Sequence, residues 1–462
     1  MFAKAIYQER RHRLIDQLST GLVLLPGNTE LPVNYSGNDY PFRQDSHFLY
    51  FVGIDQPDLF VVVDIDSRET TLFADELTMD DIIWTGPKES FSEWAQRSGI
   101  DKVLPTASIE SVVSRASRQH RPIHYLPPYR AENALRLSSL VEVTAGRLKE
   151  TSSLSLIKAV VALRSIKGPE EIQEIERAAA IGYLMHEFVM KNVREGKTER
   201  ELATLIEGIA LNHGAGLSFP VILTQRGDVL HGHEHNQDLR SGSLLLCDAG
   251  AESLEHYASD FTRTTPVNGH FSSLQKSLYQ VVLDANNKAF ELIKPGITYK
   301  SVHLECCRLM VEGLKVLGLM KGNSDDAVAE GAHALFMVHG LGHMMGLDVH
   351  DMEDLGEDNV GYDNQVKRSE QSGLRSLRLA RELEKGFVLT VEPGLYFISA
   401  LIDRWKAEKR HSDFICYNEV LKLKGIGGIR IEDNALVTET GSKMTGKRRL
   451  PVTPGEIETL FI

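Results

Sequence analysis

Carboxylate residues recur in predicted strands of the second half of this 462-residue chain, and their positions could hold metal ions. The segment LLLCDAG carries Asp248, TVEPGLY carries Glu392 and GIRIED carries Glu432. A carboxylate among leucine, valine and isoleucine is costly to bury without a partner. The sequence offers no obvious lysine or arginine for each of these acids. Two divalent cations about 3.5–4 Å apart would satisfy all of them and could activate a water molecule as a nucleophile.

Two further segments complete the candidate set. Asp260 lies in ASDFTRT, and His339 and His343 lie in HGLGH, with His350 following in DVHD. The two histidines are four residues apart, a spacing that can converge on one metal from a helix, but the glycines between them favour a loop. Carboxylates with one imidazole suit Mn²⁺, Co²⁺ or Zn²⁺ better than Cu²⁺.

Each residue also has an ordinary structural explanation. Asp248 could end its strand at a turn. Asp260 could pair with Arg263, and Glu432 with Arg430. A lone histidine is more often structural than a ligand. All of these explanations would have to hold together in this order along the chain, so the combined set favours a metal site.

The elements that position these residues form an α/β pattern. SLLLCDAG (243–250) and HYASDFTRTTPV (256–267) are predicted to be partner strands, and VLTVEPG and GIRIEDNALV two more. Gly168 and Pro169 predict a boundary followed by a helix that runs to about Asn192. The polar stretch 353–384 predicts a long loop with one or two helical turns.

Residues 1 to about 160 alternate between apolar runs and polar helical stretches, with GLVLLPGN and LFVVVDID as buried strands. The length predicts two or three domains. We place a first domain at 1–160 and a second at 165–462. No repeat at solenoid spacing is found.

Composition excludes several classes of partner. The formal charge is −13, which disfavours nucleic acid and anionic membranes as partners. Apolar runs such as Leu59 to Val63 are too short to span a bilayer. The four cysteines include no C-x-x-C pair, which argues against a disulfide framework or a thiolate zinc site. The N-terminal stretch lacks an apolar core of the secretory kind, so we expect a cytoplasmic protein.

The ordered set DAG, SDFTRT, HGLGH with DVHD, TVEPGLY and GIRIED resembles the metal-binding signature of the prolidase and aminopeptidase P family. The resemblance covers nearly the whole chain. PFRQDSHFLYFVGIDQPD (41–58) resembles the N-terminal domain of that family. GLRSLRLARELEKG (373–386) and the long insert between Glu392 and Glu432 resemble prolidases more than the short aminopeptidases P.

The resemblance implies a site residue by residue. Asp248 would hold one metal and His343 the other, Asp260 would contact both or chelate one, and Glu432 would bridge them. Glu392 would ligate a metal and shuttle a proton. The substrate-side histidines correspond to His231 in DVLHGHEH, His339 and His350, with His339 or His350 donating to the developing oxyanion. Arg378 and Arg430 correspond to the arginines that bind the substrate carboxylate in prolidases.

The implied fold is a pita-bread catalytic domain with two α/β halves related by a pseudo-twofold axis, preceded by a creatinase-like α/β domain. The first two metal-binding strands would be neighbours in an antiparallel sheet. Two divalent ions, Mn²⁺ first and Co²⁺ or Zn²⁺ as alternatives, would be the cofactors. A homodimer or larger assembly is expected.

The implied activity is hydrolysis of Xaa-Pro peptide bonds in di- or oligopeptides. Arg378 would meet the free carboxylate of a dipeptide, which favours an Xaa-Pro dipeptidase. The alternative is an Xaa-Pro aminopeptidase that acts on longer peptides with proline in second position. A non-catalytic pita-bread binding protein is a more distant alternative, because such proteins lack the metal ligands.

Overall fold

The structure is a computed structural model that describes residues 1–461, and it divides into two compact units. Unit 1 comprises Met1–Arg164 with Asp354–Asn359, and unit 2 comprises Ser165–Glu353 with Val360–Ile462. Within the part of the chain that the structure describes, no helix is long and apolar enough to cross a membrane.

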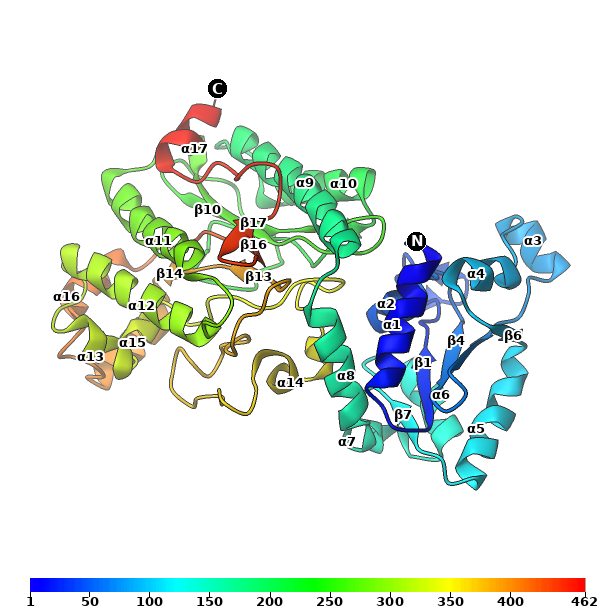
Figure 1. The fold of residues 1–462 in the computed structure, drawn as a ribbon. Coiled ribbons are helices and arrows are strands. Elements are labelled where there is room, and N and C mark those ends of the chain that lie inside the picture. The colour runs from blue at the N-terminus through cyan, green and yellow to red at the C-terminus, as the bar shows by residue number, and fades with distance from the viewer. Residues whose placement is uncertain (462) are drawn as a thin grey trace. The chain divides into compact units, whose positions relative to one another are not determined.

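Unit 1 is built on a five-stranded sheet with the order β6-β5-β4-β1-β7 (Figure 1). The predicted strands GLVLLPGN and LFVVVDID form β1 and β4, which pair antiparallel, whereas β7 joins β1 in parallel. Alternate residues of these strands, such as Leu24 and Val62, pack against α5 and α6 to form its core. Its strands and helices are α1 (Lys4–Asp16), β1 (Leu22–Pro26), β2 (Pro32–Tyr35), β3 (Asn38–Asp39), α2 (Ser46–Val52), β4 (Phe60–Asp64), β5 (Glu69–Phe73), α3 (Met79–Thr85), α4 (Phe91–Ser98), β6 (Lys102–Leu104), α5 (Ile109–Arg118), β7 (Ile123–Tyr125), α6 (Ala131–Val141), α7 (Leu148–Thr151) and α8 (Leu154–Ser165).

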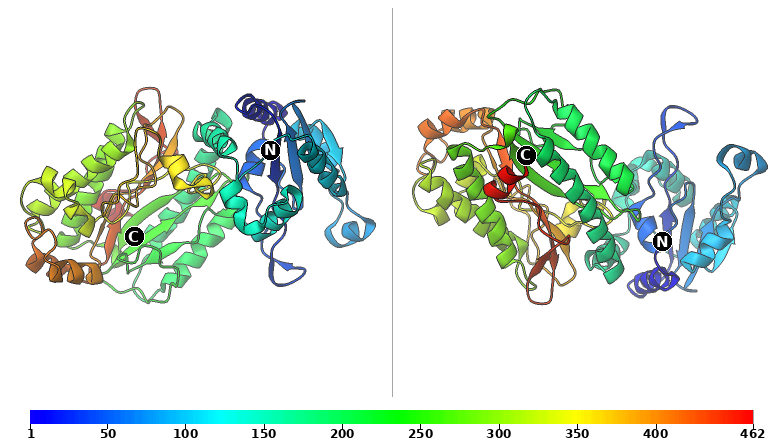
Figure 2. Two further views of the ribbon diagram at one scale, coloured as in Figure 1. Left: turned by 90° about the horizontal axis from the view of Figure 1, so that it is seen from below. Right: turned by 90° about the horizontal axis from the view of Figure 1, so that it is seen from above.

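Unit 2 contains two pairs of packed helices, α9 with α10 and α11 with α12, and its strands lie between the pairs (Figures 1 and 2). Helix α9 begins at Pro169, with Gly168 as its N-cap, and ends at Asn192, as the sequence predicts. The helices are α9 (Pro169–Asn192), α10 (Glu199–His213), α11 (Ser273–Leu292), α12 (Tyr299–Val316), α13 (Ser324–Ala329), α14 (Glu357–Gly361), α15 (Ser399–Ala407), α16 (Tyr417–Val420) and α17 (Pro454–Leu460). The chain passes from one unit to the other at three points, inside α8, inside the 3₁₀ helix η5 (Glu353–Leu355) and inside α14.

The strands of unit 2 form small antiparallel sheets, with the orders β12-β10-β9, β13-β16-β17, β14-β15 and β11-β8. They are β8 (Gly216–Leu217), β9 (Ile222–Thr224), β10 (Leu244–Ala249), β11 (Ala251–Glu252), β12 (Phe261–Pro266), β13 (Val388–Val391), β14 (Gly394–Tyr396), β15 (Gly428–Arg430), β16 (Asp433–Val437) and β17 (Ser442–Met444).

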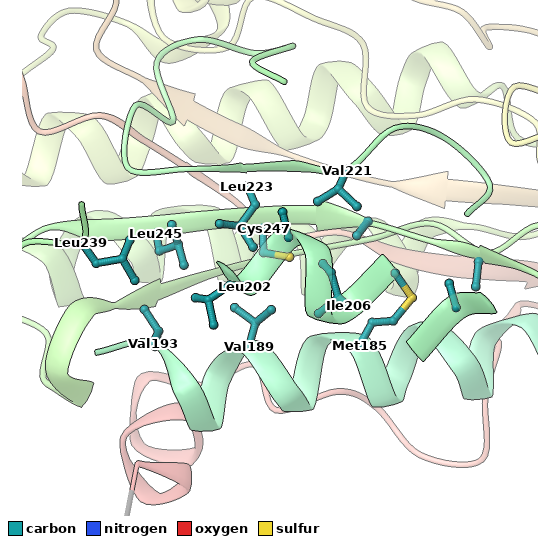
Figure 3. Packing of buried hydrophobic residues seen from close by; sticks show 14 of the residues in the cluster. Met185, Val189, Val193, Leu202, Ile206, Val221, Leu223, Leu239, Leu245 and Cys247 are labelled. Carbon is teal, nitrogen blue, oxygen red and sulfur yellow. The ribbon is translucent and has the colours of Figure 1, made fainter. Parts of the chain in front are cut away.

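The core beneath β9 and β10 is apolar throughout (Figure 3). Met185 and Val189 of α9 and Ile206 of α10 point toward Leu223 and Cys247 of the strands. These side chains are buried, and apolar burial contributes about 25 cal/mol per Å². This packing holds β10, and therefore Asp248 at its end, in a fixed position.

Two predicted strands differ from the structure. GIRIEDNALV, predicted as one strand, is divided into β15 and β16, which belong to different sheets. The division arises because Ile431 donates its backbone N–H to Pro393 and Glu432 donates to Thr262, so the chain crosses between partners there. The strand predicted over 256–267 begins only at Phe261, since the backbone of His256 has a positive φ of 65° and turns the chain.

Candidate metal centre

Asp248 and Asp260 come together because β10 and β12 pair antiparallel. Asp248 lies opposite Thr262, and Asp260 lies two residues before Thr262, so both acids emerge on one face of the pair. The carboxyl groups of Asp248 and Asp260 contact each other. Between them, Gly250 is required by packing, since a Cβ at that position would lie 1.8 Å from the carbonyl oxygen of Ser259.

His343 lies on an irregular segment that runs along β13. The backbone of Thr390 donates to the His343 carbonyl over 3.0 Å, and the Thr390 hydroxyl accepts from the His343 N–H over 3.1 Å. A Cβ at Gly342 would lie 2.0 Å from the Thr390 carbonyl oxygen, so the second glycine of HGLGH permits this close approach. The glycines therefore form a loop and not a helix, as predicted.

The tautomer of His343 follows from its backbone contact. Its Nδ1 lies 3.0 Å from the carbonyl oxygen of Met344, which can only accept, so Nδ1 carries the hydrogen. The lone pair is therefore on Nε2. This atom lies 3.4 Å from Oδ2 of Asp260 and 3.9 Å from Oε1 of Glu392. A backbone carbonyl that orients a histidine in this way is the usual arrangement around a metal ligand.

Glu392 and Glu432 reach the same place from two neighbouring connections. Glu392 follows β13 and donates its N–H to Leu341 over 2.8 Å. Glu432 lies between β15 and β16, and its Oε2 accepts from the Thr262 hydroxyl over 2.7 Å. Donor atoms of Asp260, His343 and Glu432 all lie within 4.8 Å of one another, and all three residues are buried.

The electrostatics of this group favour a cation. Burial, and then repulsion from Asp248, raise the pKa of Asp260 well above its ordinary value. Burial, and then repulsion from Asp260, do the same for the pKa of Glu432, and burial raises the pKa of Glu392. Oδ1 of Asp248 and Oδ1 of Asp260 are buried without a hydrogen-bond partner among residues 1–461. Buried acids with unmatched oxygens and an oriented imidazole fit divalent metal ions, which supply the missing positive charge.

The guanidinium of Arg430 binds other side chains of the site. Its guanidinium donates to Oδ2 of Asp248 and, over 2.8 Å, to the hydroxyl of Tyr396. Its Nε donates to the Thr262 hydroxyl over 3.1 Å. The pairing of Glu432 with Arg430 considered above is therefore not the contact formed, and neither is Asp260 with Arg263, which binds Asp433. Arg430 instead supports Asp248, so one of these acids has a basic partner.

His339 lies beside Glu392, with its Nδ1 3.6 Å from Oε2 of that residue. Both of its ring nitrogens are engaged, Nδ1 with the Gly340 carbonyl at 2.7 Å and Nε2 with the Tyr396 hydroxyl at 2.7 Å. Burial, and then the charge of Arg430, lower the pKa of His339 to about 4, so the ring is neutral.

The other candidates lie around this group. The ring of His350 is 4.2 Å from that of His343, centroid to centroid, and its side chain is partly exposed. Arg378 forms an ion pair with Glu353, and a third of its side chain is exposed. His231 lies on an exposed loop, where partial burial, and then the charge of Arg430, lower its pKa. The structure thus gathers the five predicted ligands together, with His339 beside them.

Three residues of this site were missed from the sequence. Thr262 links Glu432 to Arg430, and Tyr396 links Arg430 to His339. Asn434 holds the backbone of Asp260, accepting from its N–H over 3.1 Å and donating to its carbonyl. Thr262 and Tyr396 stand within the motifs SDFTRT and TVEPGLY, so their place in these strands was a usable signal, whereas Asn434 gave none.

Comparison with known proteins identifies the family models that match. Residues 173–439 match metallopeptidase family M24, and residues 7–124 match the aminopeptidase P N-terminal domain. The chain is 31% identical to the human Xaa-Pro dipeptidase over 98% of this chain and 92% of that protein. It is 32% identical to the Xaa-Pro aminopeptidase of Escherichia coli K12 over 99% of this chain and 97% of that protein. The solved structure of zinc-substituted E. coli aminopeptidase P in complex with product superimposes with a TM-score of 0.80, at 29% identity, and covers 99% of this chain and 98% of that one.

Proposed function

The chain belongs to metallopeptidase family M24, and on this premise we propose that it hydrolyses Xaa-Pro peptide bonds with two divalent metal ions. The observation that carries the proposal is the buried convergence of Asp260, His343 and Glu432. Asp248 and Glu392 adjoin this group and complete the set of ligands. When bound, the ions would acidify a water molecule and polarise the scissile carbonyl group.

Glu392 is the residue best placed to move a proton. Its carboxylate lies near Nε2 of His343 on one oxygen and near Nδ1 of His339 on the other. Burial raises its pKa, which suits a carboxylate that takes a proton from the attacking water and later gives it to the leaving proline nitrogen. His350 and His231 remain the candidates for contact with the substrate, and His339 would have to release Tyr396 or Gly340 to act there.

Specificity for proline has a simple physical basis. A prolyl nitrogen carries no hydrogen and its φ angle is fixed, so a site shaped around its ring can reject ordinary peptides. A relative named Xaa-Pro dipeptidase is 31% identical to this chain, and a relative named Xaa-Pro aminopeptidase is 32% identical, so sequence identity does not separate the two activities. The choice between the two activities depends on which residues contact the substrate on the carboxyl side of its proline.

We favour the dipeptidase, and the supporting residue is Arg378. Its side chain is one-third exposed and its charge acts on His350 and Glu392, so it lies at the border of the candidate site. A free prolyl carboxylate could take the place of its partner Glu353. The aminopeptidase alternative is supported by the solved structure of E. coli aminopeptidase P, which covers 99% of this chain.

The finer parts of the proposal are Mn²⁺ as the preferred ion, an assembly of two or more copies, and a cytoplasmic location. Mn²⁺ is supported by the excess of carboxylate over imidazole among the ligands. A reducing compartment is in keeping with the four cysteines, which are all present as thiols.

The experiment is a paired assay on metal-stripped protein re-supplied with Mn²⁺, with an Xaa-Pro dipeptide and an Xaa-Pro-Yaa tripeptide. Cleavage of the dipeptide alone would support the dipeptidase. In that case Arg378→Ala should raise KM for the dipeptide, while Arg375→Ala, an exposed neighbour, should leave it unchanged. Equal or better cleavage of the tripeptide would favour the aminopeptidase. Cleavage without metal, or none of either substrate, would refute the proposal.

A further inference from the structure

A second group of metal-binding side chains lies in unit 2 apart from the candidate metal centre. His303 and Cys307 are four residues apart on α12, so they project from one face of that helix. His333 faces them from the short 3₁₀ helix η4 (Ala332–Leu335). Each residue offers a donor atom within 4.8 Å of the other two. All three are buried, with exposed fractions of 0%, 0% and 2%.

These side chains are not satisfied by hydrogen bonds. The one polar contact between them joins Cys307 Sγ to His303 Nε2 at 3.5 Å. Nδ1 of His303 and both ring nitrogens of His333 are buried with no partner within residues 1–461. A buried polar atom without a hydrogen-bond partner is unfavourable in free energy. A ring nitrogen of His333 that has no partner, beside a second imidazole and a thiol, needs an explanation.

Protonation does not provide that explanation. Burial, and then the neighbouring His333, lower the pKa of His303 to about 3. Burial, and then the neighbouring His411, lower the pKa of His333 to about 4. Both rings are therefore neutral, with a lone pair available. Gly373 leaves the space that the His333 ring occupies, because a Cβ at that position would lie 2.8 Å from its Nε2.

We propose that His303, Cys307 and His333 form a second metal site, which takes a single zinc ion. Two imidazoles and a thiolate suit the borderline-soft Zn²⁺ and not Mn²⁺, which prefers oxygen ligands. Zn–S and Zn–N bonds of about 2.3 and 2.05 Å at a tetrahedral angle separate sulfur from nitrogen by about 3.6 Å. The observed 3.5 Å between Cys307 Sγ and His303 Nε2 already matches that separation. On binding, the Cys307 thiol loses its proton to solvent and a zinc–sulfur bond forms. A water molecule would take the fourth position.

The site would join two elements that frame the candidate metal centre. Tyr299, one turn before His303 on α12, donates its hydroxyl proton to the carbonyl of Thr390, next to β13's end. The 3₁₀ helix with His333 leads directly into the segment that carries His339 and His343. Zinc would therefore fix α12 against the start of the HGLGH segment. This inference does not depend on the proposed peptidase activity.

The test uses cobalt as a spectroscopic substitute for zinc in the full-length chain. Protein produced in zinc-depleted medium with Co²⁺ should show thiolate-to-cobalt charge-transfer absorption in the near ultraviolet. The candidate metal centre contains no sulfur ligand, so cobalt bound there cannot give this band. Cys307→Ser should abolish the band, whereas Cys306→Ser should retain it. Cys306 is the matched control, because it is equally buried on the same helix but its Sγ donates to the Ala285 carbonyl.

Metal analysis provides the second measurement. After growth with zinc, the chain and Cys306→Ser should contain one more zinc ion per chain than Cys307→Ser and His333→Gln. Circular dichroism checks that the variants are folded. If Cys307→Ser fails to fold, the cobalt spectra of the unmodified chain and of His333→Gln test the second metal site in its place. A missing charge-transfer band in the unmodified chain, its persistence in Cys307→Ser, or copper at one ion per chain in place of zinc would overturn the proposal.

Discussion

At the scale of single residues, the candidate metal centre is defined by charge that lacks compensation. Asp248 has Arg430 as a partner, while Asp260, Glu392 and Glu432 are held by burial at raised pKa values. Such a group is unfavourable unless cations or protons neutralise it. In the proposed function the residues therefore divide by role: those that would hold the ions, and Glu392, which would also exchange a proton with the substrate.

Glu392→Gln tests the proton-transfer role. Glutamine keeps the size and one carbonyl oxygen of the side chain but cannot take up a proton. General acid–base groups contribute about 10²- to 10⁴-fold, so kcat should fall by at least about 10²-fold. Steady-state kinetics on an Xaa-Pro dipeptide would measure this. Glu439→Gln, on the exposed surface, is the control and should keep normal kcat. A change of only a few-fold in Glu392→Gln would exclude the proton shuttle.

Asp260→Asn tests metal ligation instead. The amide has no negative charge, and its nitrogen does not bind these ions, so the variant should lose metal together with activity. Metal content measured after gel filtration should drop below that of the unmodified chain. The exposed Asp403→Asn should bind metal normally. Full occupancy in Asp260→Asn would remove this residue from the set of ligands.

At the scale of elements, strands and close backbone contacts bring distant motifs together. The residues predict β10 and β12 as partner strands, the family resemblance implies that they pair antiparallel, and the turn residues predict the helix that begins at Pro169. The break between β15 and β16 is not predicted, because it depends on which strands receive each half. Arg430 as the partner of Asp248 also depends on that tertiary choice. Neither the strand break nor the Arg430–Asp248 pair can be predicted from the local sequence.

The buried hydroxyl of Tyr299 connects α12 to the strand that carries Glu392. It lies 2.5 Å from the Thr390 carbonyl oxygen. Tyr299→Phe removes this hydrogen bond without leaving a cavity, and should lower the stability of unit 2 by about 1 kcal/mol. Thermal denaturation should show a decrease in Tm of about 2 °C.

Tyr279→Phe is a closely matched control for that change. Tyr279 is as fully buried as Tyr299, at 0% exposure. Its hydroxyl, however, has no hydrogen-bond partner within the part of the chain described by the structure. Removing an unmatched polar group costs nothing, so this variant should have an unchanged or higher Tm. Equal losses in both variants would show that the Thr390 contact contributes no stability.

At the scale of the whole molecule, the resemblance to the prolidase and aminopeptidase P family and the fold that it implies are confirmed. A family M24 catalytic domain follows an aminopeptidase P N-terminal domain, and solved aminopeptidase P structures match over 99% of the chain. The motifs predict the family because each one combines a strand pattern with a candidate metal ligand. The group of His303, Cys307 and His333 is not predicted from the sequence. His333 lies 26 residues after Cys307, and no motif joins the three residues.

The two compact units lead to a last prediction, which also tests the proposed domains at 1–160 and 165–462. Every proposed metal ligand lies in unit 2. An ion present at 100 times its dissociation constant stabilises the folded state by about 2.7 kcal/mol, so chelation should lower the Tm of unit 2 by about 5 °C. Unit 1 should be unaffected. Differential scanning calorimetry of the full chain should then show two transitions, of which only one moves with a chelator. Tyr299→Phe should lower that same transition, and a chelator already saturated with the same metal ion that the protein holds should move neither. A single transition, or two that shift together, would mean that the proposed domains do not unfold independently.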